Sequence, residues 1–240
     1  MQLTDFKVLS FDCYGTLIDW ETGIWEALQP MLATATNKLD REAALEVFAR
    51  HESAQEAATP DMIYSELLAV VHEYMAEELG APANVKLGKA FGHSVPRWPA
   101  FADSAKSLRY LKDHYKLVIL SNVDRASFKA SNKKLGVEFD AIYTAEEIGS
   151  YKPDPRNFAY LIERLQSDLG LSVKDDLHTA QSLFHDHVPA AKVGLARAWI
   201  DRRQGHAGSG ATMPLAERPA VDFYFPSLAA LVDAHKLLGS

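Results

Sequence analysis

Polar residues that can carry out covalent chemistry follow short apolar runs in this chain. Asp12 ends a first run, Ser121 and Asn122 end a second, and Lys152 follows a third within the segment YKPDP. An aspartate can attack an electrophilic centre and form a covalent ester or acyl phosphate. A neighbouring lysine can neutralise that aspartate and hold it ionised and oriented. These residue types therefore indicate nucleophilic catalysis on a small electrophile.

Two further groups of residues have the chemistry of a binding site. Gly15 and Thr16 closely follow the first run and can supply backbone N–H groups to a substrate anion at a tight turn. Further along the chain, Asp186 is flanked by His185 and His187. Imidazoles exchange protons near neutral pH, and a carboxylate can hold a substrate ammonium. A structural or solvated imidazole is the simpler alternative for each histidine.

The apolar runs are predicted to be buried strands. The predicted strands are residues 6–11, 116–120, 139–143, 177–181, 196–200 and 221–225. Helices with apolar residues at helical spacing are predicted among the later strands, at residues 104–114, 155–169 and 228–238. This alternation predicts an α/β fold, a Rossmann-like parallel sheet covered on both faces. In such sheets ligands bind beyond the carboxyl ends of the strands, so the polar residues are expected to converge there.

Residues 20–95 contain no convincing strand. Three helices are predicted in this block, at residues 22–35, 40–57 and 60–79. Pro60 suits the first turn of the third helix. An all-helical block between the first strand and the rest of the sheet is expected to be an inserted cap. The predicted organisation is a core domain of residues 1–19 and 96–240 and a helical cap domain of residues 20–95.

Composition and charge narrow the class of protein. The 240 residues are 48% hydrophobic and 24% charged, which suffices for a globular core. The formal net charge is −7 and the basic residues are scattered, which disfavours nucleic-acid binding. The single cysteine excludes an internal disulfide framework. No apolar run is long enough to span a membrane and Asp5 argues against a signal peptide, so we expect a cytoplasmic protein without a membrane partner.

The motifs FDCYGTL, LSN and YKPDP, in this order and spacing, resemble those of the haloacid dehalogenase superfamily. The resemblance extends over essentially the whole chain, including a helical cap after the first motif. It implies a Rossmann-like core in which Asp12 is the nucleophile. Ser121 and Asn122 then form the second motif, and Lys152 is the third.

Two positions argue against the magnesium-dependent phosphatases of this superfamily. Those enzymes carry a second aspartate two residues after the nucleophile, where this chain has Tyr14, and an acid after the fourth strand, where it has Gln181. Mg²⁺ prefers hard oxygen ligands such as carboxylates. With Tyr14, the motif FDCYGTL instead resembles that of the L-2-haloacid dehalogenases, which attack carbon with an aspartate and hydrolyse the resulting ester. The resemblance places Tyr14 at the substrate and implies that neither a metal nor another cofactor is needed.

The dehalogenase resemblance also implies roles for other residues around a small carboxylate substrate. Ser121 would bind the substrate carboxylate, Asn122 would lie near the leaving group, and Asp186 would position Lys152 and the hydrolytic water. Arg50 is the nearest match to a cap arginine that contacts the leaving group, the alternative being a surface arginine on an amphipathic helix. Dehalogenases often form homodimers, although no apolar stripe in this sequence marks an interface.

Several residues depart from the dehalogenase pattern. Phe158 replaces a tyrosine, Leu183 replaces an asparagine, and His185 and His187 flank Asp186. A halide leaves without a proton, whereas imidazoles suit a leaving group that exchanges protons or a substrate ammonium. The chain therefore also resembles dehalogenase-like enzymes that open L-azetidine-2-carboxylate to 2-amino-4-hydroxybutyrate, and this activity is expected first. The alternatives are L-2-haloacid dehalogenation and, more remotely, a small-molecule phosphatase or a non-catalytic binding module.

Overall fold

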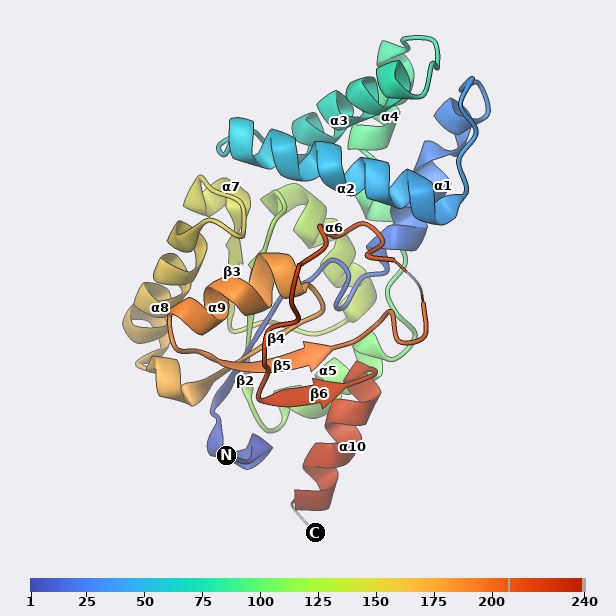
Figure 1. Cartoon of the computed structure of the whole chain (residues 1–240). Coiled ribbons are helices and arrows are strands. Elements are labelled where there is room, and N and C mark those ends of the chain that lie inside the picture. The colour runs from blue at the N-terminus through green and yellow to red at the C-terminus, as the bar shows by residue number, and fades with distance from the viewer. Residues whose placement is uncertain (207, 239–240) are drawn as a thin grey trace.

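A single parallel sheet forms the centre of the molecule (Figure 1). In the computed structural model, which describes residues 1–206 and 208–238, six strands pair in the order β3-β2-β1-β4-β5-β6, and every pair is parallel. The strands are β1 Val8–Phe11, β2 Lys116–Ser121, β3 Ala141–Thr144, β4 Asp176–Ala180, β5 Ala196–Ile200 and β6 Phe223–Phe225. The strand order reverses direction at β1, and this is where open α/β sheets form their ligand crevice.

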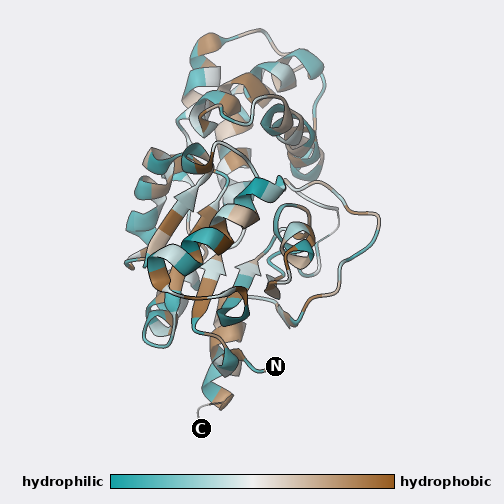
Figure 2. Ribbon diagram, turned by 90° about the vertical axis from the view of Figure 1, so that its left-hand side faces the viewer, coloured by the Kyte–Doolittle hydropathy of each residue, from teal (hydrophilic) through white to brown (hydrophobic). Residues whose placement is uncertain are grey.

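Helices cover both faces of the sheet because alternate side chains of each strand point to opposite faces. On one face, Val8 and Leu120 pack in the same apolar cluster as Phe158 of α8. On the other face, Leu9 belongs with Leu108 of α5 in a larger cluster that extends into the cap helices. The helices that cover the two faces are α5 Ser104–Lys112, α6 Arg125–Leu135, α7 Ala145–Ile148, α8 Pro155–Leu169, α9 Val188–Lys192 and α10 Leu228–Leu238. They mix hydrophilic and hydrophobic residues, as elements with one exposed face do (Figure 2).

The Rossmann-like α/β fold predicted from the sequence is confirmed. Each of the six predicted strands overlaps an observed one, although the first, third and last are shorter than expected. The helices predicted at residues 155–169 and 228–238 have the observed bounds. Among the helices of the described residues, none has the length and apolar character needed to cross a bilayer.

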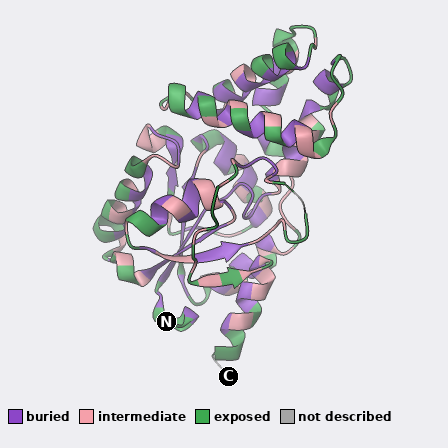
Figure 3. Ribbon diagram, viewed as in Figure 1, coloured by how far each residue is buried: buried purple, intermediate pink, exposed green. Residues whose placement is uncertain are grey.

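Four helices lie together beyond the carboxyl ends of the strands (Figure 1). They are α1 Trp20–Leu32, α2 Arg41–Ala58, α3 Tyr64–Glu78 and α4 Val85–Gly92. We call them the cap helices; the division into two domains remains a prediction. Buried residues recur along their length between exposed ones, as in helices with one face packed against the rest of the molecule (Figure 3).

The predicted start of the third cap helix at Pro60 is wrong. The N–H of Met62 donates to the carbonyl of Thr59 at 3.0 Å, which closes a turn around Pro60. Ile63 then has extended backbone (φ −65°, ψ 136°), and α3 begins at Tyr64. Proline therefore serves here as a turn residue, a role it fills as readily as the first turn of a helix.

Gly23 in α1 is expected to tolerate no side chain. A Cβ at this position would lie 2.2 Å from Cγ of buried Trp98, whose ring packs edge-on against Tyr14 at 5.6 Å. We expect Gly23→Ala to lower the free energy of unfolding by about 2 kcal/mol, despite alanine's higher helix propensity, because a packed ring must move. Gly88→Ala in α4 is the control, since its Cβ would meet its nearest neighbour at 3.4 Å. Urea unfolding of both variants checks the prediction; equal stabilities would contradict it.

Candidate active site

The carboxylate of Asp12 is held at the end of β1 by two side chains. Thr16 Oγ1 donates to Asp12 Oδ2 at 2.7 Å, and Lys152 Nζ donates to Asp12 Oδ1 at 3.0 Å. The turn between Asp12 and Thr16 requires Gly15, which has φ +92°. Burial raises the pKa of Asp12 and Lys152 opposes that effect. The result is a desolvated, oriented carboxylate at the crevice of the sheet.

Lys152 is the cation that joins the acidic groups of the site. Its ammonium is buried and donates to Asp12 Oδ1, to Asp186 Oδ1 at 2.6 Å and to the carbonyl of Leu120 at 3.0 Å. Burial alone would lower the pKa of Lys152, but Asp12 and Asp186 raise it above its ordinary value. Asn122 fixes the Lys152 backbone, since its Oδ1 accepts the lysine N–H at 2.6 Å and its Nδ2 donates to the lysine carbonyl at 2.9 Å.

Asp186 connects the site to a buried polar chain inside the sheet. It lies in the π-helical turn Leu183–His187 after β4, and its Oδ1 is 3.0 Å from His178 Nε2. His178 Nδ1 is 2.9 Å from Ser10 Oγ, which donates to Asp176 Oδ2 at 2.7 Å. Burial opposes ionisation of Asp186, but Lys152 and His178 hold its pKa below the ordinary value. The sequence signal for this polar network is His178, a histidine inside an apolar strand.

A small cavity of about 30 Å³ lies between these groups and the cap helices. Its lining consists of Asp12, Tyr14, Trp20, Glu52, Glu56, Tyr64, Ser121, Asn122, Lys152, Ser182, His185 and Asp186. A volume of this size holds roughly one or two water molecules. The cap must therefore move, or its side chains must rearrange, before a substrate reaches Asp12.

The cap helix α2 contributes two carboxyl groups to the cavity. Glu52 and Glu56 are four residues apart, so they lie on one face of the helix, and both are buried. Tyr64 Oη donates to Glu52 Oε1 at 2.6 Å, and Asn122 Nδ2 donates to Glu56 Oε1 at 3.0 Å. Burial raises the pKa of Glu52 to about 8, and burial together with Glu52 raises the pKa of Glu56 well above its usual range.

The raised pKa of Glu52 makes stability depend on pH. Between its unfolded value near 4.5 and about 8, the folded protein holds a proton that the unfolded chain releases, so wild-type stability falls as pH rises. Glu52→Gln keeps an acceptor for Tyr64 and removes this dependence. We expect the variant to gain about 3 kcal/mol over wild type between about pH 5 and about pH 9 in urea unfolding. Exposed Glu46 on the same helix supplies the control, Glu46→Gln, and parallel curves for both variants would contradict the prediction.

The structure brings most of the predicted site residues together. Seven of them line the cavity: Asp12, Tyr14, Ser121, Asn122, Lys152, His185 and Asp186. His185 Nε2 lies 3.8 Å from Glu56 Oε2, and burial lowers the pKa of His185 to about 4. This histidine is therefore a neutral imidazole facing the cavity at neutral pH. Thr16 lies behind Asp12 and orients it without lining the cavity.

Three predicted residues do not reach the cavity. Arg50 is half-exposed and forms an ion pair with Glu78 at 2.6 Å, because it lies two residues before Glu52 and points to another side of α2. His187 Nε2 is 2.9 Å from the carbonyl of Ala180, and burial lowers its pKa to about 4, as for a structural imidazole. The N–H of Gly15, expected to bind a substrate anion, donates instead to the carbonyl of Ile18 at 2.8 Å.

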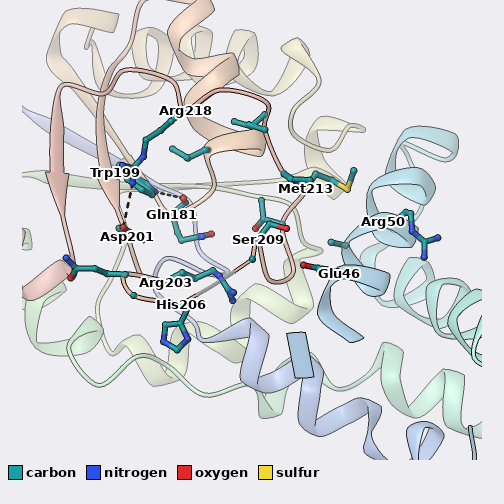
Figure 4. Close-up of a pocket in the computed structure, with 18 residues that line it drawn as sticks. Glu46, Arg50, Gln181, Trp199, Asp201, Arg203, His206, Ser209, Met213 and Arg218 are labelled. Carbon is teal, nitrogen blue, oxygen red and sulfur yellow. Dashed lines mark hydrogen bonds and ion pairs between the residues drawn. The ribbon is translucent and has the colours of Figure 1, made fainter. Parts of the chain in front are cut away.

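A second, larger cavity of about 840 Å³ lies beside the site, between α2, the ends of β4 and β5 and the loop that follows (Figure 4). Trp199 forms one wall, with the Arg218 guanidinium 3.8 Å from its ring centre. Arg203 of this loop forms ion pairs with two residues of the cap helices, Glu21 at 2.6 Å and Glu42 at 2.7 Å. Neither the Asp12 carboxylate nor the Lys152 ammonium lines this cavity.

The site combines a buried aspartate at the strand-order reversal with a lysine that a second aspartate also binds, and the cap helices lie over these groups. The chain belongs to the haloacid dehalogenase-like hydrolase family, whose model matches residues 6–174. It is similar to (S)-2-haloacid dehalogenase of Pseudomonas putida, at 24% identity over 85% of this chain and 88% of that protein.

Solved structures of L-2-haloacid dehalogenases share the fold. The defluorinating enzyme Rha0230 matches with a TM-score of 0.76 and 21% identity, over 97% of each chain. The enzyme from Xanthobacter autotrophicus with chloropropionic acid covalently bound matches with a TM-score of 0.76 and 18% identity, over 96% of this chain and 98% of that one. At these identities the likeness establishes the α/β architecture, and the chemistry of this chain rests on its own residues.

Proposed function

We propose that this hydrolase attacks a saturated carbon of a small 2-substituted carboxylate through Asp12, without a metal. The observation that carries the proposal is the buried Lys152 ammonium between Asp12 and Asp186. An Asp12 oxygen would form a bond to the carbon while the leaving group departs with its bonding electrons. Water would then attack the carbonyl carbon of the ester, regenerating Asp12 and releasing the hydroxylated product.

The leaving group best supported by relatives is a halide. The similar proteins from two Pseudomonas species are both named (S)-2-haloacid dehalogenase. The reaction would convert an L-2-haloacid and water into the 2-hydroxyacid, halide and a proton. Ser121 Oγ would bind the substrate carboxylate; in support, this atom is buried in the cavity lining and has no hydrogen-bond partner among the described residues.

A second candidate is ring opening of L-azetidine-2-carboxylate. The supporting observation is the neutral imidazole of His185, which faces the cavity beside Glu56. Attack of Asp12 on the ring CH₂ next to nitrogen would break that C–N bond and relieve ring strain. Hydrolysis of the ester would give 2-amino-4-hydroxybutyrate, with the amine still attached.

One experiment separates the candidates. Purified protein receives L-2-chloropropionate or L-azetidine-2-carboxylate in the presence of EDTA, with Asp12→Asn as the control for each. Halide release that depends on Asp12 supports the dehalogenase, and ring-opened product supports the second candidate. Activity that appears only with added Mg²⁺ and a phosphate ester would contradict the proposal and indicate a phosphatase.

A further inference from the structure

The cap side of the Asp12 cavity is acidic. Glu52 and Glu56 are 2% and 5% exposed and both line the cavity. Neither forms an ion pair with Lys or Arg among the described residues; their hydrogen bonds come from the Tyr64 hydroxyl and the Asn122 amide. Buried carboxyl groups are rare without a cationic partner, because removing their charge from water is costly.

The cavity offers these two acids no free cation. Among the described residues that line it, Lys152 is the one ammonium or guanidinium. Its three N–H groups already donate to Asp12, Asp186 and the carbonyl of Leu120. An anionic substrate would therefore enter a cavity with four acidic residues and a single cation that is fully engaged.

Unpartnered buried atoms around the same cavity point to a ligand. Ser121 Oγ, Asp186 Oδ2 and His185 Nε2 are buried and lack hydrogen-bond partners among the described residues. Native proteins leave few buried polar atoms unpaired, so a bound molecule is a natural source of their partners. The hydroxyl suits a carboxylate, whereas Asp186 Oδ2 and a neutral His185 nitrogen beside Glu56 suit N–H donors.

We propose that Glu52 and Glu56 recognise a cationic nitrogen, so that the substrate is a small carboxylate that also carries an amine. This inference rests on the proposed function, because it names the substrate class of the Asp12 reaction. The amine N–H groups would donate to Glu56 and Glu52, and the substrate carboxylate would lie toward Ser121. On binding the ammonium, the cap carboxyl groups would release the protons that burial holds on them, and they would then carry a charge opposite to that of the arginine expected to contact a leaving group.

The test compares two ligands that differ in one ring atom. L-azetidine-2-carboxylate and cyclobutanecarboxylate have the same ring size and carboxylate, but only the former carries a ring ammonium. Isothermal titration with Asp12→Asn prevents turnover, and any effect of that substitution on the carboxylate applies to both ligands. We expect the amine to bind about tenfold more tightly or better, the value of one charge-assisted hydrogen bond.

Variants of Glu52 and Glu56 show whether these residues provide the preference for the amine. Glu56→Gln or Glu52→Gln in the Asp12→Asn background should reduce the affinity ratio toward one, whereas Glu46→Gln should leave it unchanged. Equal or tighter binding of cyclobutanecarboxylate, or no measurable binding of the amine, would overturn the inference. These readouts do not depend on catalysis. If Asp12-dependent turnover of L-2-chloropropionate persists while the amine preference is absent, the inference fails and the proposed function stands. If the preference is intact but neither L-2-chloropropionate nor L-azetidine-2-carboxylate shows Asp12-dependent turnover, the proposed function fails and the inference stands.

Discussion

Asp12→Asn is expected to reduce turnover by about 10⁴-fold or more, at saturating substrate and neutral pH. The amide has the shape of the carboxylate but is not a nucleophile, so the covalent step is lost. Thr16 can still donate to the amide oxygen, so we expect the fold to persist. Product release measured beside circular dichroism separates loss of chemistry from loss of structure.

The matched control is Asp19→Asn, the same substitution seven residues further along the chain. Asp19 caps α1 by accepting from the N–H of Thr22 at 3.1 Å, and it does not line the Asp12 cavity. Asparagine caps helices as well as aspartate, so Asp19→Asn should retain wild-type turnover. If Asp12→Asn keeps more than about a hundredth of the wild-type rate, nucleophilic attack by Asp12 is contradicted.

Lys152→Met is expected to lower the free energy of unfolding by about 3–5 kcal/mol at neutral pH and to abolish turnover. The substitution leaves Asp12 and Asp186 buried without their shared cation. Both carboxyl groups then have raised pKa values, so folding is linked to proton uptake and the deficit should shrink as pH falls. Urea unfolding across a pH series measures both effects.

The double variant Lys152→Met, Asp186→Asn is the sharper form of this prediction. It removes one of the two uncompensated charges, so part of the lost stability should return while turnover stays absent. The amide introduced by Asp186→Asn keeps an oxygen that can accept from His178, the neighbour of Asp186 at 3.0 Å. Wild-type stability of the single variant would show that the lysine is not needed to hold the carboxylates.

Local sequence signals sufficed to predict the sheet and the edge of the sheet at which the polar residues meet. Each strand is a short apolar run, and parallel strands bring the residues that follow them to one edge. Asp12 could therefore be expected to meet Asn122 and Lys152, although more than a hundred residues separate it from either of them. The turn at Pro60 could not be anticipated, because proline suits both a turn and the first turn of a helix.

The residues on the cap side of the site could not be predicted, because the rotation of α2 about its own axis determines which of its side chains face the cavity. Phe48 and Glu52 are four residues apart and share the inward face of α2, whereas Arg50 is rotated by about 200° from Glu52. The expectation for Arg50 rests on a resemblance in which the cap helices align only loosely. A loose alignment does not define which way each side chain of a helix points. Helical spacing from Phe48 places Glu52 and Glu56 on the same face of the helix, which is the face toward the cavity.

The remaining differences depend on backbone hydrogen bonds. Gly15 is needed for its positive φ, and its N–H closes the turn onto Ile18 rather than facing a ligand. His185 and His187 are two residues apart in a π-helical turn, so one faces the cavity and the other contacts the Ala180 carbonyl. Sequence spacing alone does not reveal a π-turn.

The most direct test of covalent attack by Asp12 is a single turnover in water enriched in the heavy isotope of oxygen, with enzyme in excess over substrate. We expect water to attack the Asp12 ester, so that the heavy atom appears in the peptide that contains Asp12. The first product then carries an ordinary oxygen taken from that carboxylate. Heavy oxygen in the product and none in the Asp12 peptide would show direct attack by water and contradict the covalent mechanism.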